Sequence, residues 1–335
     1  MLGEFDLIKR HLAALQRGSA LRSDGYPESR DALAGVELGA GDDCALLVPS
    51  PHHLLAVSVD TSIADVHFPA DAPAEAIGHR ALAVSLSDLA AMGAQPRWCL
   101  LALSLPEVDE AWVGEFCRGF HALAARSGTR LVGGDLTRGH LSISVTVHGE
   151  VRPSAVLRRD GAEAEQLIAV SGPLGGARGG LEAWRGGSRA YEQDPLLQAY
   201  LRPQPRIEAG IALAELASAA LDVSDGLLAD LDHLCRASGV GAKIDLTRLP
   251  LAPGLIAALG HERAIAAALD GGDDYELLFT LPEHYLATAR ARLAGCGCEL
   301  RVIGRTTEAL GIRNWQGAPL AARGWRHFDG DGDQA

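Results

Sequence analysis

The sequence is short of lysine, of cysteine pairs and of long hydrophobic runs, and each shortage excludes a class of protein. Only Lys9 and Lys243 are lysines, and neither completes a Gly-x-x-x-x-Gly-Lys-Ser/Thr motif, so a Walker-type ATP site is excluded. No apolar run approaches the roughly 20 residues of a membrane helix, and we expect no membrane partner. The first residues, from Met1 to Asp6, do not resemble a secretory signal, which predicts a cytoplasmic location.

The spacing of the cysteines and the net charge argue against two further classes of protein. The close pair Cys296 and Cys298 has no second pair at zinc-binding spacing, so the six cysteines are predicted to be reduced and mostly structural. The formal net charge of −13 argues against nucleic acid as a partner, because phosphate backbones attract basic surfaces. An acidic protein that binds phosphates needs a cation between the two.

The length of 335 residues and a hydrophobic content of 47% predict two domains with separate cores. The pattern breaks near residues 150–162, so we predict domains at 1–150 and 151–328, followed by a disordered acidic tail at 329–335. Helices are predicted at 5–16, 73–92, 109–126, 195–201, 205–217, 226–237 and 283–294. Strands are predicted at 44–48, 54–59, 98–105, 130–132, 141–147, 167–170, 220–223, 243–246, 275–280 and 299–303. Strands and helices mix in both halves, so the fold class is α/β or α+β.

Aspartates recur in short Gly/Ser/Thr-rich segments at the ends of apolar strands. They are Asp42, Asp43, Asp60, Asp135, Asp222 and Asp225. Asp88 differs, because it lies inside an apolar helix, where a carboxylate is costly unless it is paired or bound to a cation. Each turn aspartate alone is more simply explained as a turn former or helix cap. The shared theme, with Asp88 and the pair of Asp222 and Asp225, favours Mg²⁺, which takes carboxylate oxygens and substrate phosphate. Spacing does not show that these segments meet.

Two other segments give weak signals. Residues 172–180 are rich in glycine and follow a strand, which is typical of a simple turn as well as of a phosphate loop. The end of the chain, from Asp329 to Asp333, lacks the later glutamate of a calcium loop, so it is interpreted as a solvated tail.

At these motifs the chain resembles the bacterial thiamine-monophosphate kinases, nearly from end to end. The motifs that carry the resemblance are Gly39–Ala45, Ser58–Thr61 with His67-Phe68, Ala81–Gly93, Gly133–Gly139, Leu221–Leu227, Gly271–Leu277 and Gly324–Phe328. The resemblance implies an aminoimidazole-ribonucleotide-synthetase-like fold, with an N-terminal domain that forms a homodimer and a C-terminal α/β domain. It also implies the reaction, in which ATP phosphorylates thiamine monophosphate to thiamine diphosphate with the help of several Mg²⁺ ions.

The resemblance also implies the functional residues. The metal positions are Asp43, Ser58, Val59, Asp60, Asp88, Asp135, Asp222 and Asp225, of which Asp60, Asp88, Asp135 and Asp225 are taken as catalytic. The ATP positions are Gly134, Asp135, Arg159 and Ser224, and the thiamine-phosphate positions are His67, Asp273 and Trp325. Three positions depart from the family. Val59 replaces a hydroxyl residue and could contact metal only through its carbonyl, Asp273 stands where glutamate is usual, and Trp325 replaces Tyr or Phe. His67 as a surface residue and Trp325 as C-terminal packing are the plainer alternatives.

The implied mechanism suits a site without lysine. A phosphate monoester has its second pKa near roughly 6, so the acceptor is largely ionised at neutral pH and needs no general base. In-line transfer between Mg-bound phosphates then depends on positioning and on offsetting the repulsion of two anions. The alternatives are another ATP-dependent synthetase of the superfamily, or a non-catalytic nucleotide or metal sensor. The first cysteine is Cys44 and the chain ends at Ala335, which disfavours relatives with a reactive N-terminal or C-terminal cysteine.

Overall fold

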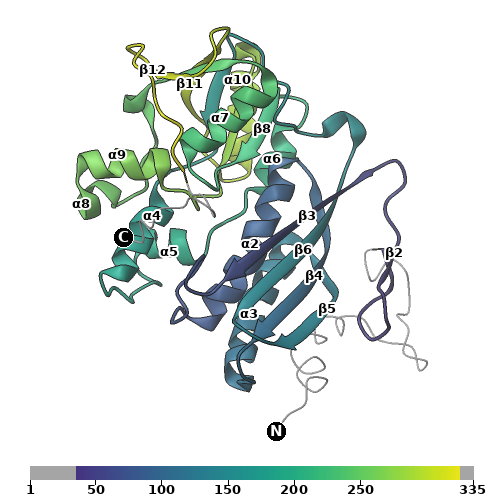
Figure 1. Ribbon diagram of the computed structural model, residues 1–335. Helices are drawn as coiled ribbons and strands as arrows, with labels where there is room; N and C mark the ends of the chain where they lie inside the picture. Colours follow the sequence, from purple (N-terminus) through teal and green to yellow (C-terminus); the bar gives the residue numbers. More distant parts are fainter. Residues whose placement is uncertain (1–34, 325–335) are drawn as a thin grey trace. The chain divides into compact units, whose positions relative to one another are not determined.

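The computed structural model describes residues 35–324 (Figure 1). The chain divides between Val156 and Leu157 into two compact units, which are described one after the other. The helix predicted at 5–16, the position of Trp325 and the tail predicted at 329–335 lie outside the described residues.

The first unit is a four-stranded sheet with two long helices packed on it. The strand order is β3-β6-β4-β5, with the β4/β5 pair parallel and the other pairs antiparallel. The strands are β3 (Leu54–Ile63), β4 (Gln95–Leu105), β5 (Arg130–Arg138) and β6 (Ser142–Val151), and the helices are α2 (Ala74–Ala91) and α3 (Glu110–Ser127). A small antiparallel pair, β1 (Val36–Leu38) with β2 (Leu46–Leu47), precedes them, and a short helix, η4 (Pro153–Ala155), ends the unit. Helix α2 packs on β3 and β6, and α3 packs on α2 (Figure 1).

Helices α2 and α3 touch through glycine. A Cβ at Gly78 would lie 2.0 Å from the carbonyl oxygen of Phe116, and one at Gly119 would lie 1.8 Å from that of Glu75. Both helices end as the sequence predicts: Asp109 caps α3 through the Ala111 and Trp112 amides, and a left-handed Gly128 closes it. The close approach holds α2, with Asp88 in its last turns, firmly in the first unit.

The predicted turns at Asp60 and Asp135 are wrong, because both residues lie inside strands. β3 pairs with β6 over ten residues, from Leu54 opposite Val151 to Ile63 opposite Ser142. β5 likewise continues past Asp135 in its ladder with β4. Cross-strand pairing supplies hydrogen bonds that local turn preference cannot match, so tertiary context overrides the Gly/Ser/Asp signal.

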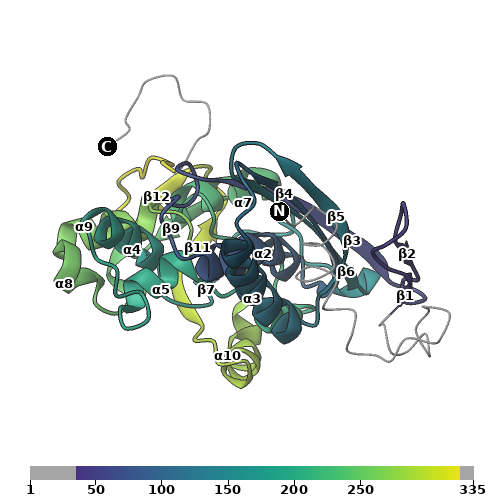
Figure 2. The same ribbon diagram turned by 90° about the horizontal axis from the view of Figure 1, so that it is seen from below.

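The second unit is a six-stranded sheet with the order β12-β9-β11-β7-β10-β8, in which only the β12/β9 pair is parallel. Its strands are β7 (Leu167–Val170), β8 (Ala219–Asp222), β9 (Gly241–Ile244), β10 (Leu277–Leu281), β11 (Arg301–Thr307) and β12 (Ile312–Asn314). Its helices are α4 (Gly176–Arg185), α5 (Pro195–Leu201), α6 (Ile207–Leu213), α7 (Leu227–Ser238), α8 (Leu255–Leu259), α9 (His261–Asp270) and α10 (Leu286–Gly295), with short 3-10 turns η5 (Leu246–Arg248) and η6 (Glu283–Tyr285). Helices α4, α5, α8 and α9 gather on one side (Figure 2). Elements β1, β12, α4, α8 and α9 were not predicted.

The ladder places several loops at one edge of the second sheet. Asp222 at the end of β8 pairs with Leu277 at the start of β10, and Val170 at the end of β7 pairs with Arg301 at the start of β11. The loops that follow β7, β8 and β9 therefore share this edge with the loops that precede β10 and β11. This edge carries the predicted positions Asp222, Ser224, Asp225 and Asp273.

Among the described residues, no helix is long and apolar enough to cross a membrane. All six cysteines are free thiols, and Cys99, Cys117 and Cys235 are buried, as predicted.

Candidate functional site: two aspartate clusters

The first cluster joins β3 to α2. The Ser58 hydroxyl donates a hydrogen bond to the Asp88 carboxylate. Asp60, two residues along the same strand, carries a buried Oδ2 that has no hydrogen-bond partner within residues 35–324. Burial and the neighbouring Asp88 carboxylate raise the pKa of Asp60 to about 6, against an opposing hydrogen bond from Ser85. Two carboxylates that repel each other, one with an unsatisfied oxygen, form an arrangement that a cation stabilises.

The donor set of this cluster fits Mg²⁺. Within residues 35–324, no group of three or more His, Cys, Asp and Glu side chains gathers closely enough to hold a metal on its own. Mg²⁺ is usually held by one or two carboxylates, and water and substrate phosphate complete its coordination. Asp60 and Asp88 supply that pair, and the unsatisfied Asp60 oxygen is the atom that a cation would satisfy.

The second cluster lies at the loop edge of the second sheet. Three main-chain hydrogen bonds of 2.8 Å tie the segment after β8 to the one before β10, from Val223 N to Glu276 O, from Asp273 N to Ser224 O and from Tyr275 N to Val223 O. These bonds bring together four predicted positions, namely Asp222, Ser224, Asp225 and Asp273.

The backbone before β10 has an uncommon conformation. Gly272, Asp273 and Tyr275 all have positive φ, which is rare for a bulky residue such as Tyr275. The Tyr275 hydroxyl donates to Asp273 Oδ1 over 2.9 Å and so orients this carboxylate. Local strain of this kind concentrates at functional sites, where the surrounding contacts enforce it.

Asp230, which sequence reasoning missed, holds the loop after β8. Its Oδ2 accepts hydrogen bonds from the amides of Ser224, Asp225 and Gly226, at 3.0, 3.1 and 3.1 Å. The side chain is 5% exposed, and burial, together with the Asp222 and Asp225 carboxylates, raises its pKa to about 7. The available signal was an acidic residue in the first turn of a helix that follows a Ser-Asp-Gly segment.

The other positions of the first unit lie apart from the Asp60 cluster. The strand order places three strand spacings, about 14 Å, between β3 and β5, which carries Gly134 and Asp135. Asp135 is in register across the sheet with Ala102 and, through β6, with Thr61 on β3. Asp60 precedes Thr61 in the strand, so the Asp60 and Asp135 carboxylates belong to opposite faces of the sheet. Asp43 is exposed between β1 and β2, and its side chain has no hydrogen-bond or ion-pair partner among the described residues.

Val59 and His67 flank the cluster. Val59 is 59% exposed and belongs to an outer strand, so alternate carbonyl groups of this strand do not face the sheet. His67 is partly buried, and its Nδ1 lies 3.0 Å from the Ile63 amide, from which it accepts a hydrogen bond. In the neutral ring this contact assigns the proton to Nε2.

Arg159 lies at the far end of the β8–α7 segment. Its carbonyl accepts a hydrogen bond from Ser238 at the end of α7, whereas Ser224 precedes the start of that helix. Twelve residues of helix span about 18 Å, so the structure does not bring the backbones of these two predicted ATP positions together. The Arg159 side chain is exposed.

The glycine-rich segment 172–180 is not an open phosphate loop. The Asp274 carboxylate already accepts hydrogen bonds from the amides of Gly175, at 2.7 Å, and Ala177, at 3.3 Å, at the start of α4. Burial raises the pKa of Asp274 to about 7, the two amides oppose this shift, and the Glu276 and Asp273 charges add to it. A protein carboxylate therefore occupies the place that a phosphate would take.

Asp274 predicts a specific pH dependence of stability. Its pKa rises on folding from 3.8 to about 7, so its stabilising contribution is complete below about pH 4 and is lost as the pH rises through 7. Between pH 5 and 8, we expect the unfolding free energy of the wild type to fall by about 2–3 kcal/mol more than that of Asp274→Asn. Urea denaturation of both proteins across this range measures the difference, and parallel curves would contradict it.

Comparison with known proteins agrees with this architecture. The family models for the N-terminal and C-terminal domains of AIR synthase related protein match residues 41–151 and 163–313. The chain thus has the two-domain architecture of that class. It is 40% identical to the thiamine-monophosphate kinase of Escherichia coli strain K12 over 333 residues, which covers 97% of this chain and 98% of that protein.

Two solved structures are similar over nearly the whole chain. Thiamine-monophosphate kinase from Stenotrophomonas maltophilia K279a is 42% identical, with a TM-score of 0.84 over 95% of this chain and 98% of that one. AaThiL complexed with AMPPCP and TMP is 31% identical, with a TM-score of 0.75 over 98% and 97%. The chain therefore belongs to the thiamine-monophosphate kinase family of enzymes, and the predicted resemblance, fold class and enzyme class are confirmed.

Proposed function

We propose that this protein transfers the γ-phosphoryl group of ATP to thiamine monophosphate, giving ADP and thiamine diphosphate, with Mg²⁺ between protein and phosphates. Relatives named thiamine-monophosphate kinase and a similar structure complexed with AMPPCP and TMP support the choice of substrates. The observation in this chain that carries the proposal is the unsatisfied, buried oxygen of Asp60 beside Asp88. A stable protein tolerates such a pair where a cation completes it.

Each cluster has a separate task in this proposal. Asp60 and Asp88 would hold Mg²⁺, and the Ser58 hydroxyl fixes the orientation of Asp88. Bound Mg²⁺ would supply the positive charge that lets two phosphate groups approach each other. In the second unit, Asp230 fixes the main chain that carries Asp222 and Asp225. The acceptor phosphate is already ionised, so these side chains position and neutralise rather than remove a proton.

We also propose that the enzyme is a homodimer formed through the open face of the first sheet. Leu55, Val57 and Val59 on β3 are 47%, 55% and 59% exposed, although they alternate along one strand of a core sheet. Apolar faces of this kind mark association sites. A second copy would cover these residues and would add a second Asp135 to the assembly. Light scattering that gives the mass of a monomer at micromolar concentration would contradict the pairing.

The remaining details rest on the sequence. The number of Mg²⁺ ions, the cytoplasmic location, the roles of Trp325 and Arg159 and the absence of nucleic-acid and membrane partners stay predictions.

Formation of thiamine diphosphate is the direct test of the proposed reaction. We expect product from ATP and thiamine monophosphate only when Mg²⁺ is present, and none when free thiamine, which lacks the acceptor phosphate, replaces the monophosphate. Chromatography of the thiamine compounds measures both. If ATP binds but no diphosphate forms, the reaction is wrong and a sensor role or another acceptor takes its place.

A further inference from the structure

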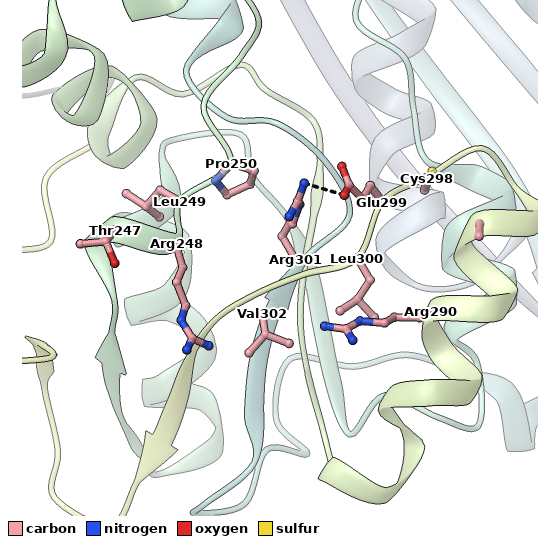
Figure 3. A pocket seen from close by; sticks show the side chains of 11 residues that line it. Thr247, Arg248, Leu249, Pro250, Arg290, Cys298, Glu299, Leu300, Arg301 and Val302 are labelled. Atoms are coloured by element: carbon pink, nitrogen blue, oxygen red, sulfur yellow. Dashed lines mark ion pairs between the residues drawn. The ribbon is translucent and has the colours of Figure 1, made fainter.

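The second unit contains a surface pocket that shares no lining residue with the aspartate cluster of that unit. Its volume is about 730 Å³, and its walls come from η5, α10 and the first residues of β11 (Figure 3). Pockets of a few hundred to a thousand cubic ångströms are the usual size for small organic ligands. The aspartates of that cluster follow β8 or precede β10, whereas the pocket opens beside β11, two to three strands away in the order β8-β10-β7-β11. Two to three strand spacings are about 10–14 Å, so the pocket is a separate feature of the same edge.

Three arginines line the pocket in a protein that is acidic overall. They are Arg248, Arg290 and Arg301, and Glu299 is the one acidic side chain among the lining residues. Arg301 is paired with Glu299 at 2.6 Å, so this pair is neutral. Arg248 is paired with Asp245 in the same way, so it is Arg290 that gives the pocket a net positive charge in a protein that is acidic overall.

Arg248 and Arg290 are arranged to meet a ligand. The Nε of Arg248 is held 3.2 Å from Asp245 Oδ2, and the other oxygen of Asp245 already accepts bonds from Thr247. The terminal amino groups of Arg248 stay available, and Arg290 has no hydrogen-bond or ion-pair partner within residues 35–324. Figure 3 shows the two guanidinium groups reaching from opposite sides toward the space beside Val302, while Arg301 turns to Glu299.

The pocket also has an apolar wall. Val302, which lies between the two guanidinium groups in Figure 3, is half-buried, and Leu300 beside Arg290 is buried. A bare inorganic ion would leave this wall in contact with water, whereas a ligand with an apolar body would cover it.

We propose that this pocket binds a small organic phosphate, whose phosphate group contacts Arg248 and Arg290 and whose apolar body rests on Leu300 and Val302. A terminal phosphate has three acceptor oxygens, enough for two guanidinium groups at once, and a carboxylate has only two. The pocket uses none of the residues assigned to the proposed reaction, so its occupancy and the kinase activity can be tested apart.

Phenyl phosphate is a suitable probe, titrated calorimetrically into the full-length protein in EDTA so that Mg-dependent binding elsewhere is suppressed. We expect saturable binding to the wild-type protein and a dissociation constant about tenfold higher in Arg290→Gln and in Arg248→Gln, because each removes a charge-assisted contact. Arg292→Gln removes the same charge from the same helix outside the pocket lining and should change the constant by less than about twofold. Both pocket variants alter exposed side chains, so the fold should be kept.

Cys298, a lining residue, provides a second readout on the unmodified chain. Phenyl phosphate should slow its alkylation, measured by peptide mass spectrometry, and should leave the exposed Cys44 unaffected. The proposal is overturned if the wild-type protein shows no saturable binding or if Arg292→Gln weakens binding as much as Arg290→Gln. Equal affinity for inorganic phosphate would overturn the assignment of an organic ligand.

Discussion

Replacing Asp60 by asparagine is expected to lower the turnover number by about 10²–10³-fold while the protein stays folded. The carboxylate lies beside Asp88, and its buried oxygen has no hydrogen-bond partner in the described part of the chain, so it is the atom best placed for a cation. An amide is nearly the same size but carries no charge and binds Mg²⁺ poorly. The loss should appear as a lower kcat together with a higher Mg²⁺ concentration for half-maximal rate in a thiamine diphosphate assay.

The same substitution should not destabilise the metal-free protein. The pKa of Asp60 rises on folding from 3.8 to about 6, so its stabilising contribution is lost as the pH rises through 6. At pH 8 in EDTA, Asp60→Asn should therefore be about 1–2 kcal/mol more stable than the wild type, because burial and repulsion by Asp88 no longer act on a charge.

Asp65→Asn is the matched control, since this exposed aspartate lies in the same region and has a backbone conformation that asparagine also adopts. It should keep both wild-type turnover and wild-type stability. An Asp60→Asn enzyme with wild-type rates at limiting Mg²⁺ would remove Asp60 from the metal site.

The fold was predictable where local chemistry sets the outcome. Helices α2 and α3 begin and end within two residues of the predicted positions, because Pro73, Asp109 and Gly128 act on the chain next to them. The strands around Asp60 and Asp135 were predicted too short, since their length depends on partner strands distant in sequence. Helix α9 was not predicted, because its buried face consists mainly of alanine, which gives little hydrophobic signal until the helix packs against α4, α7 and α8.

The residue types of the candidate site were predictable from the sequence, but which of these residues lie close together was not. The sequence identified Asp88 as an unusual carboxylate within an apolar helix, and its contact with Ser58 agrees with that interpretation. The distance between β3 and β5 is a property of strand order, which no spacing along the chain reveals. Asp230 was missed for a related reason. An acidic residue in the first turn of a helix is common, and its role here follows from the three loop amides that donate hydrogen bonds to it, which the sequence does not show.

Those three amides make Asp230→Ala the second substitution with a large expected effect. Removal of the carboxylate leaves the buried Gly226 amide and the part-buried amides of Ser224 and Asp225 without their acceptor. Each amide that water cannot reach then costs about 1–3 kcal/mol. We expect a loss of about 2–4 kcal/mol in unfolding free energy, measured by urea denaturation. The loop that carries Asp222 and Asp225 should also lose its fixed geometry, with a fall in kcat of about 10–100-fold.

Asp230→Asn separates the geometric role of this residue from its charge. The amide oxygen can still accept the loop hydrogen bonds, and repulsion from Asp222 and Asp225 disappears, so stability should stay near the wild-type value. Asp230→Ala should also raise the Mg²⁺ concentration for half-maximal rate. In Asp230→Asn, both kcat and this Mg²⁺ concentration should lie close to the wild-type values. Asp232→Asn, on the same helix and paired with Arg236, is the control and should change neither quantity. If Asp230→Ala is unstable but has the wild-type Mg²⁺ dependence once folded, Asp230 supports the fold alone and does not position the aspartates of the second cluster.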